Sequence, residues 1–379
     1  MKLWKRAAAA IKDRKSLLAV GFSRRNSSYR NADLEAAIIK ATSHDDSSVD
    51  YSNAHRVYKW IRSSPLNLKT LVYAISSRVN HTRSWIVALK SLMLLHGVLC
   101  CKVPSVVGEF RRLPFDLSDF SDGHSCLSKT WGFNVFVRTY FAFLHHYSSF
   151  LSDQIHRLRG NNRRSLEKTS DSVIQELERI QKLQSLLDMI LQIRPVADNM
   201  KKTLILEAMD CLVIESINIY GRICGAVMKV LPLAGKSEAA TVLKIVNKTT
   251  SQGEDLIVYF EFCKGFGVSN AREIPQFVRI PEEEVEAIEK MIDTVQEKPK
   301  LEKDEEKEDE KAMVVLEQPK KLQTIITDKW EIFEDDYRCF DRKDKWEIFE
   351  DEYHQNHLPL ITMNQPVYIT YTMPDLITF

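Results

Sequence analysis

Glycine and proline are scarce in this chain, with 12 of each among 379 residues. So few turn-forming residues exclude most architectures built from short strands and favour long helices. Alternation of apolar and polar residues, the signature of half-buried strands, is absent before residue 300. Because 44% of the residues are hydrophobic, most of the chain should fold, and we expect an all-α domain.

Cysteine usage gives no sign of a disulfide framework or of a zinc site. The seven cysteines contain no CxxC pair, and their number is odd. This pattern is typical of a reduced, intracellular compartment.

Long uninterrupted apolar runs are also missing. The run at 85–101 contains Lys90 and His96, and the run at 204–234 contains five charged residues. The N-terminal residues lack an apolar core long enough for a signal peptide. We therefore expect no membrane-spanning helix, and any work at a membrane should be done from its surface.

Catalytic motifs are absent as well. The sequence contains no GxGxxG, GxxxxGK[ST], HExxH or GxSxG pattern, so we expect neither an enzyme nor a bound cofactor. Cys100 and Cys101 lie near His96 and could be taken for a nucleophile and its base. Both cysteines lie within or at the end of an apolar helix, however, which favours buried structural thiols.

The periodic segments predict a series of helices with short joints. We expect helices at about 3–18, 33–41, 53–62, 66–79, 82–99, 104–113, 128–151, 169–193, 197–231, 236–262 and 282–295. The segment 82–99 is apolar on nearly all faces and should be a central helix. Residues 160–164 should form a loop, and Gln252–Gly253 should break the segment 236–262 into two helices.

The charges are distributed unevenly. Residues 1–112 hold 20 Lys/Arg against 7 Asp/Glu, whereas residues 297–379 hold 12 against 21. The almost purely charged stretch 298–311 cannot bury enough apolar area to order itself. We predict a basic N-terminal helix at 1–24, a helical domain at 25–296 and a flexible acidic tail at 297–379.

A candidate anion site lies in the basic front part. Lys40 ends one helix, a polar loop follows, and His55, Arg56 and Lys59 begin the next. Donors from these two helix ends could converge on a phosphorylated headgroup. Nucleic acid is the competing partner, but no helix-turn-helix, zinc finger or aromatic stacking motif accompanies the charge, so we expect no nucleic-acid binding.

Four motifs together resemble a known family. They are Lys40-Ala-Thr-Ser-His44, His55-x-x-Tyr58, Ser84-Trp85-x4-Lys90-Ser91-Leu92-x3-His96 and Phe136-x-Arg138-x-Tyr140-x3-Leu144. In this order they look like the landmarks of the ANTH domain of clathrin assembly proteins, and the chain is most similar to the plant members. The resemblance implies an elongated helical solenoid, or superhelix. It also implies binding of phosphatidylinositol 4,5-bisphosphate, clathrin and vesicle SNAREs.

The lipid motif of that family is matched only in part. Lys40, His55 and Tyr58 fit it, but Ser52, Asn53 and Ala54 stand where the family has a basic run. Because several charge-assisted phosphate contacts are then missing, we predict weak or less selective phosphoinositide binding. Lys90 and His96 should be polar members of the helix packing rather than ligands.

The acidic tail contains an internal repeat. Residues 328–337 recur at 344–353 with nine of ten positions identical. Trp330 and Phe333, and again Trp346 and Phe349, are followed by acidic residues, and these look like WxxF peptides that dock on adaptor-complex appendage domains. Aromatic anchors would fill pockets, and two tethered copies would raise avidity. The alternatives are a duplication without function, or helical turns that fold back on the domain.

Two hypotheses follow for the function. The first is a peripheral adaptor of clathrin-mediated endocytosis on the cytoplasmic face of the plasma membrane, in coated pits and vesicles and at the Golgi. The second is a cytosolic helical scaffold that binds only proteins.

Overall fold

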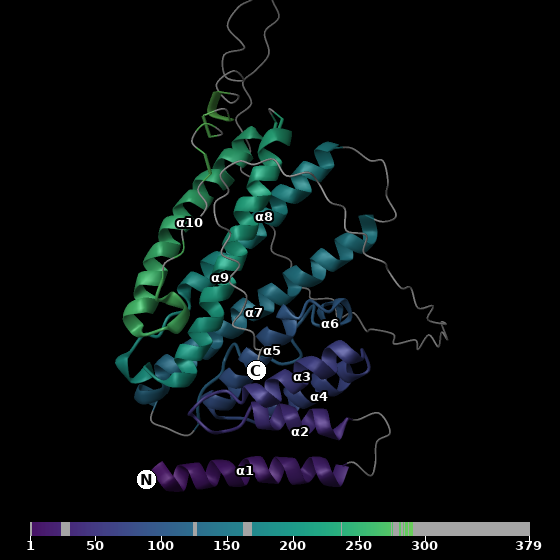
Figure 1. The fold of residues 1–379 in the computed structure, drawn as a ribbon, viewed down its shortest axis with the longest axis vertical. Helices are drawn as coiled ribbons and strands as arrows, with labels where there is room; N and C mark the ends of the chain where they lie inside the picture. The colour runs from purple at the N-terminus through teal and green to yellow at the C-terminus, as the bar shows by residue number, and fades with distance from the viewer. Residues whose placement is uncertain are drawn as a thin grey trace, which may run out of the picture. The chain divides into compact units, whose positions relative to one another are not determined.

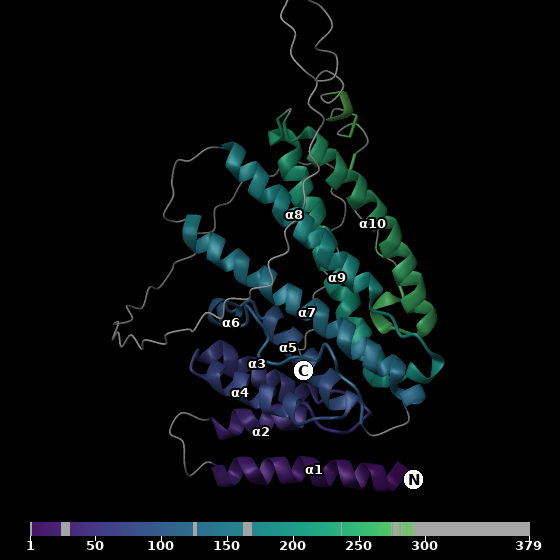
Figure 2. The same cartoon turned by 180° about the vertical axis from the view of Figure 1, so that it is seen from behind.

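The computed structural model describes residues 2–23, 31–123, 127–161, 169–235, 237–273 and single positions between 275 and 290. All regular elements in these ranges are helices (Figures 1 and 2). The α-helices are α1 (Lys2–Ser23), α2 (Ala32–Ala41), α3 (Tyr51–Ser63), α4 (Asn67–Asn80), α5 (Trp85–Cys100), α6 (Pro104–Glu109), α7 (Leu127–Asn161), α8 (Thr169–Gln192), α9 (Thr203–Val230) and α10 (Ala239–Phe266). Short 3-10 helices occupy Asp198–Met200, Leu231–Leu233 and Ser269–Ala271. The prediction of an all-α fold is confirmed.

Helices that follow one another along the chain pack against each other. α1 lies beside α2, which also contacts α3 and α4 (Figure 1). α7 then packs on α8, α8 on α9, and α10 on both α8 and α9. This order produces a stack of helices with a continuous apolar core.

The central helix α5 connects the two ends of the stack. It contacts α3 and α4 on one side and α7 and α9 on the other, and all its residues from Val87 to Leu99 are buried. Trp85 at its first turn stacks on Phe133 of α7, with 4.2 Å between ring centroids. The prediction of a central buried helix is therefore confirmed.

Three boundaries differ from the sequence-based prediction. α10 runs unbroken through Gln252 and Gly253. A β-carbon on Gly253 would lie 2.6 Å from the hydroxyl oxygen of Tyr220, so this glycine permits a close helix contact instead of ending a helix. α7 continues through Gly160 and Asn161, where a loop was expected, and α9 begins only at Thr203.

α9 and the short helix after it satisfy the length and composition of a membrane span over Thr203–Leu233. In the most apolar window, however, 61% of the residues are buried inside the domain. Its carboxylate Glu215 is only 3% exposed and is packed against other helices. These features are those of the core helix of a folded domain.

The tail predicted for residues 297–379 lies outside the described residues, and so does its repeat with Trp330, Phe333, Trp346 and Phe349.

Candidate functional site

The basic residues predicted from the sequence lie in the last turn of α2 and in the middle of α3. Lys40 is in the last turn of α2 and is exposed. Arg56 and Lys59 are exposed and stand three residues apart on α3, so they share one face of that helix. His55, one turn before Lys59, is half-buried. Because α2 packs on α3, these four side chains belong to one helix pair.

Tyr58 occupies a different environment. Its side chain is only 5% exposed and lies on the buried face of α3 with Ala54, Val57 and Ile61. The spacing of these four residues is that of an apolar helix stripe. The Tyr58 ring contacts Gly97 of α5, so closely that a β-carbon there would lie 2.1 Å from the phenolic oxygen. The position of Tyr58 is therefore one of packing, beneath the surface that carries Lys40 and Lys59.

The segment that replaces the basic run also has structural roles. Asp50 caps α3 by accepting a hydrogen bond from the backbone N–H of Asn53, at 3.0 Å, and from its amide Nδ2, at 2.6 Å. Ala54 is 2% exposed, so a lysine there would have to be buried. Ser52 is exposed and Asn53 is half-buried. Of the three positions, Ser52 alone could present a basic group to a headgroup without loss of a capping contact or burial of the new side chain.

The loop between α2 and α3, residues 42–50, is anchored by contacts to α9 and α5. The backbone N–H of Val49 donates to Glu207 of α9 at 2.9 Å, and Asp46 pairs with Lys202 at 3.8 Å. Lys90 of α5 donates from Nζ to the Ser43 hydroxyl at 3.2 Å. These contacts hold the loop in one conformation next to Lys40.

Lys90 is a buried cation, with 1% of its surface exposed. Burial lowers the pKa of its ammonium group, and the charges of Asp45, Glu207, Asp13 and Asp50 act in the opposite direction. Its place inside the helix packing confirms the prediction that it is a packing residue.

A carboxylate from α1 reaches the same loop. Asp13 accepts hydrogen bonds from the backbone N–H of His44 at 2.9 Å and from His44 Nδ1 at 2.8 Å. The guanidinium of Arg78 on α4 also donates to Asp13. Burial raises the pKa of Asp13, but the bonds from His44 and Arg78 outweigh it and lower the pKa from 3.8 to about 2. Sequence reasoning missed this cluster.

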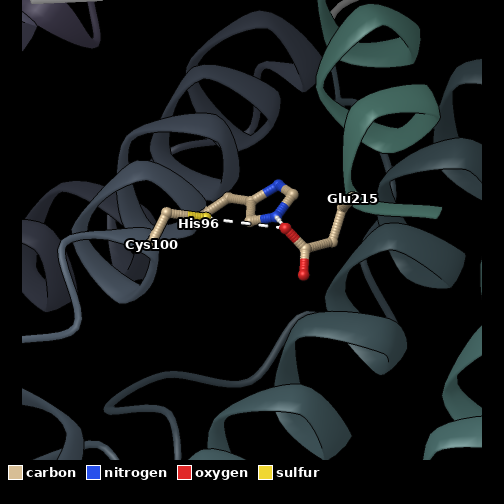
Figure 3. Close-up of side chains that lie close together, drawn as sticks. All are labelled: His96, Cys100 and Glu215. Carbon is tan, nitrogen blue, oxygen red and sulfur yellow. Dashed lines mark hydrogen bonds and ion pairs between the residues drawn. The ribbon is translucent and has the colours of Figure 1, made fainter. Parts of the chain in front are cut away.

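A second polar cluster lies in the core, where His96 and Cys100 of α5 face Glu215 of α9 (Figure 3). The Glu215 carboxylate is 3.8 Å from His96 Nε2 and 3.8 Å from the Cys100 sulfur. His96 Nδ1 hydrogen-bonds the Tyr140 hydroxyl at 2.8 Å, whereas its Nε2 has no hydrogen-bond partner.

These three side chains are of the types that bind zinc. However, burial, and then the charge of Glu215, raise the pKa of the Cys100 thiol well above its usual value. A protonated thiol is neither a good metal ligand nor a nucleophile. Because His96 is also only 1% exposed, the cluster fits a polar network within the core, as predicted for His96 and Cys100.

The ANTH domain model matches residues 33–294. The chain is 66% identical to the Arabidopsis thaliana protein named "Putative clathrin assembly protein At1g25240", over the whole of both chains. It is 47% identical to "Putative clathrin assembly protein At1g14686" of the same plant, covering 78% of this chain and 84% of the other. The match spans α2 to α10 and the long relative aligns from end to end, so this chain belongs to the ANTH domain family.

Proposed function

We propose that this protein is a non-enzymatic peripheral adaptor that binds phosphoinositide membranes and helps to assemble clathrin coats in endocytosis. The family match and the names of the relatives support the link to clathrin assembly. The observation that carries the membrane half is the set of exposed bases Lys40, Arg56 and Lys59 on the α2–α3 pair. The site of action would be the cytoplasmic face of the plasma membrane, coated pits and vesicles, and the Golgi.

The size of the expected attraction can be worked out from these bases. Each Lys or Arg near an anionic leaflet contributes about 1 kcal/mol. The three exposed bases would therefore contribute about 3 kcal/mol, and His55 would add to this when protonated. Ser52, Asn53 and Ala54 contribute no charge, and Ala54 is buried. Binding should thus be weaker than a site with a complete basic run would give.

Vesicle co-sedimentation of the full chain tests this site. Replacing Lys40, Arg56 and Lys59 together by alanine should weaken binding to vesicles that contain phosphatidylinositol 4,5-bisphosphate by about 100-fold. The matched control replaces Lys229, Lys244 and Lys264, which are exposed on α9 and α10. Equal losses in the two triple variants would mean that only net charge matters, and the site would be refuted.

The second half of the proposal concerns protein partners. Two tethered copies of a weak ligand bind a multivalent coat better than one. We propose that Trp330 and Phe333, and Trp346 and Phe349, dock on adaptor appendage domains, and that the helical domain contributes contacts to clathrin and vesicle SNAREs. Purified appendage domain should recover the full chain but not the variant Trp330→Ala plus Trp346→Ala. Equal recovery of both would leave the repeat without this role.

One observation favours the alternative of a cytosolic scaffold that binds only proteins. Asn53 and Ala54, which replace basic residues, are part of the α3 cap and of the core. A domain with this substitution could keep its fold without its lipid site. Co-sedimentation with phosphoinositide vesicles no greater than with neutral vesicles, together with intact appendage binding, would favour the scaffold.

A further inference from the structure

The cluster of Asp13, His44 and Arg78 has the features of an occupied anion site. We propose that His44 and Arg78 form a binding site for a phosphomonoester group, and that Asp13 of α1 occupies it as an internal competitor. The inference deepens the proposed membrane function and rests on it for the source of the phosphate, which would be a lipid headgroup.

The donors are arranged around both oxygens of one carboxylate. The backbone N–H of His44 donates to Oδ2, whereas His44 Nδ1 and the Arg78 guanidinium meet at Oδ1. Because a carboxylate accepts only, His44 must carry its proton on Nδ1. One main-chain donor, one imidazole and one guanidinium form the charge-assisted set that also suits phosphate oxygens.

Arg78 is held in position independently of Asp13. Its Nη2 donates to the Thr42 carbonyl oxygen at 3.0 Å and its Nε to the Thr42 hydroxyl at 3.3 Å. The Arg78 side chain is 9% exposed. The guanidinium would therefore remain in place after Asp13 left, so that an incoming anion would find a formed site.

The surroundings add positive potential. The buried ammonium of Lys90 lies 3.2 Å from the hydroxyl of Ser43, the residue before His44. Lys40 is exposed two residues before Thr42. A phosphate bound by Arg78 and His44 would thus lie close to Lys40, one of the bases assigned to the headgroup.

The occupant is attached by a weakly buried helix. Among residues 7–21 of α1, not one is buried in the structure, and Ile11 and Leu18 are 66% and 62% exposed. A helix with so little apolar burial is held mainly by its polar contacts, and such elements open at low cost. The polar contacts of α1 include the bonds of Asp13 and a hydrogen bond from Arg78 Nη1 to the Ser16 hydroxyl at 3.3 Å. A competing anion has to replace the bonds of Asp13.

The first test uses the full chain and a soluble probe. Asp13→Asn should bind inositol 1,4,5-trisphosphate about tenfold more tightly than wild type in calorimetry. In wild type, only the fraction of molecules whose site is free of Asp13 can bind the probe, and the apparent affinity is reduced by that fraction. The control Asp33→Asn removes an equal charge from an exposed position in the first turn of α2. Equal affinities of Asp13→Asn and Asp33→Asn would overturn the proposal.

Two further measurements separate the site from its alternatives. Adding Arg78→Lys to Asp13→Asn should remove the gain in affinity for inositol 1,4,5-trisphosphate, and the melting temperature should stay close to that of Asp13→Asn. If the double variant keeps the full gain in affinity, the role of Arg78 is overturned. In wild type, the probe should increase hydrogen exchange of α1, and unchanged exchange at saturation would refute displacement.

Vesicle binding then identifies the source of the phosphate. A matching gain of Asp13→Asn on phosphatidylinositol 4,5-bisphosphate vesicles, but not on phosphatidylserine vesicles of equal charge, supports a lipid headgroup. A gain for the soluble probe alone supports the site with a soluble ligand. In that case the anion site stands and its assignment to a lipid headgroup fails, while the triple variant of Lys40, Arg56 and Lys59 tests the membrane function separately.

Discussion

Replacing Gly97 by alanine tests whether Tyr58 is a packing residue. The new β-carbon would lie 2.1 Å from the Tyr58 hydroxyl oxygen, 2.5 Å from Cζ and 3.0 Å from Cε1. Tyr58 is 5% exposed, so its ring can move away only if α3 shifts from α5. Overpacking of this kind costs up to about 3 kcal/mol, whereas alanine gains about 1 kcal/mol over glycine in a helix. We predict a net destabilisation of about 2 kcal/mol.

Urea unfolding followed by circular dichroism measures this difference. Gly225→Ala on α9 is the control, because its β-carbon would meet nothing within 4 Å and that position is exposed. The control should be as stable as wild type or slightly more so. Combining Gly97→Ala with Tyr58→Leu should recover part of the loss, since the clashing atoms are removed. If Gly97→Ala proves as stable as Gly225→Ala, the close contact of Tyr58 is refuted.

Three further predictions concern single contacts. The pKa of Asp13 is lowered to about 2, so its ionised carboxylate stabilises the fold above the ordinary pKa, and this stability is lost as pH falls towards 2. Screening of this partly exposed group reduces the contribution to about 1–2 kcal/mol. Acid unfolding of wild type, compared with that of Asp13→Asn, measures the contribution. The raised pKa of the Cys100 thiol predicts slow alkylation at pH 8 that becomes fast in urea, as read by mass spectrometry. Gln184 is 1% exposed and donates to the Ile245 carbonyl at 2.9 Å and the Thr249 hydroxyl at 3.0 Å, so Gln184→Ala should cost about 2 kcal/mol in urea unfolding.

The sequence allowed the helices to be predicted because their signals are local. Apolar periodicity and prolines located α2 to α9 to within a few residues, apart from the long C-terminal extension of α7 and the later start of α9 at Thr203. Gly253 was misinterpreted for a physical reason. A glycine in a helical pattern can end a helix or make room for a side chain of another helix. Here that side chain is Tyr220, which lies 33 positions earlier in the chain. Only the tertiary contact decides between the two.

The candidate site was predictable to a similar degree. Lys40, Arg56 and Lys59 are charged residues outside the apolar stripes of α2 and α3, and the structure exposes them. The burial of Tyr58 also had a local signal, since it falls in the apolar stripe of α3 with Val57 and Ile61. The pairing of Asp13 with Arg78 had none, because 65 residues separate them and neither belongs to a motif.

The number of basic residues in the N-terminal part of the chain is therefore larger than the number of positive charges exposed to a membrane. Arg78 and Lys90 are turned inward, where Asp13 accepts from one and the acids around the loop stabilise the other. Lys40, Arg56 and Lys59 remain at the surface. Attraction to an anionic leaflet depends on exposed charges near the contact, because salt screens charges that lie farther than about 10 Å from the lipid surface. If a phosphate displaces Asp13, Arg78 binds that phosphate and adds its charge to that of the exposed bases. Charge position and the state of α1, more than net charge, would then set the affinity.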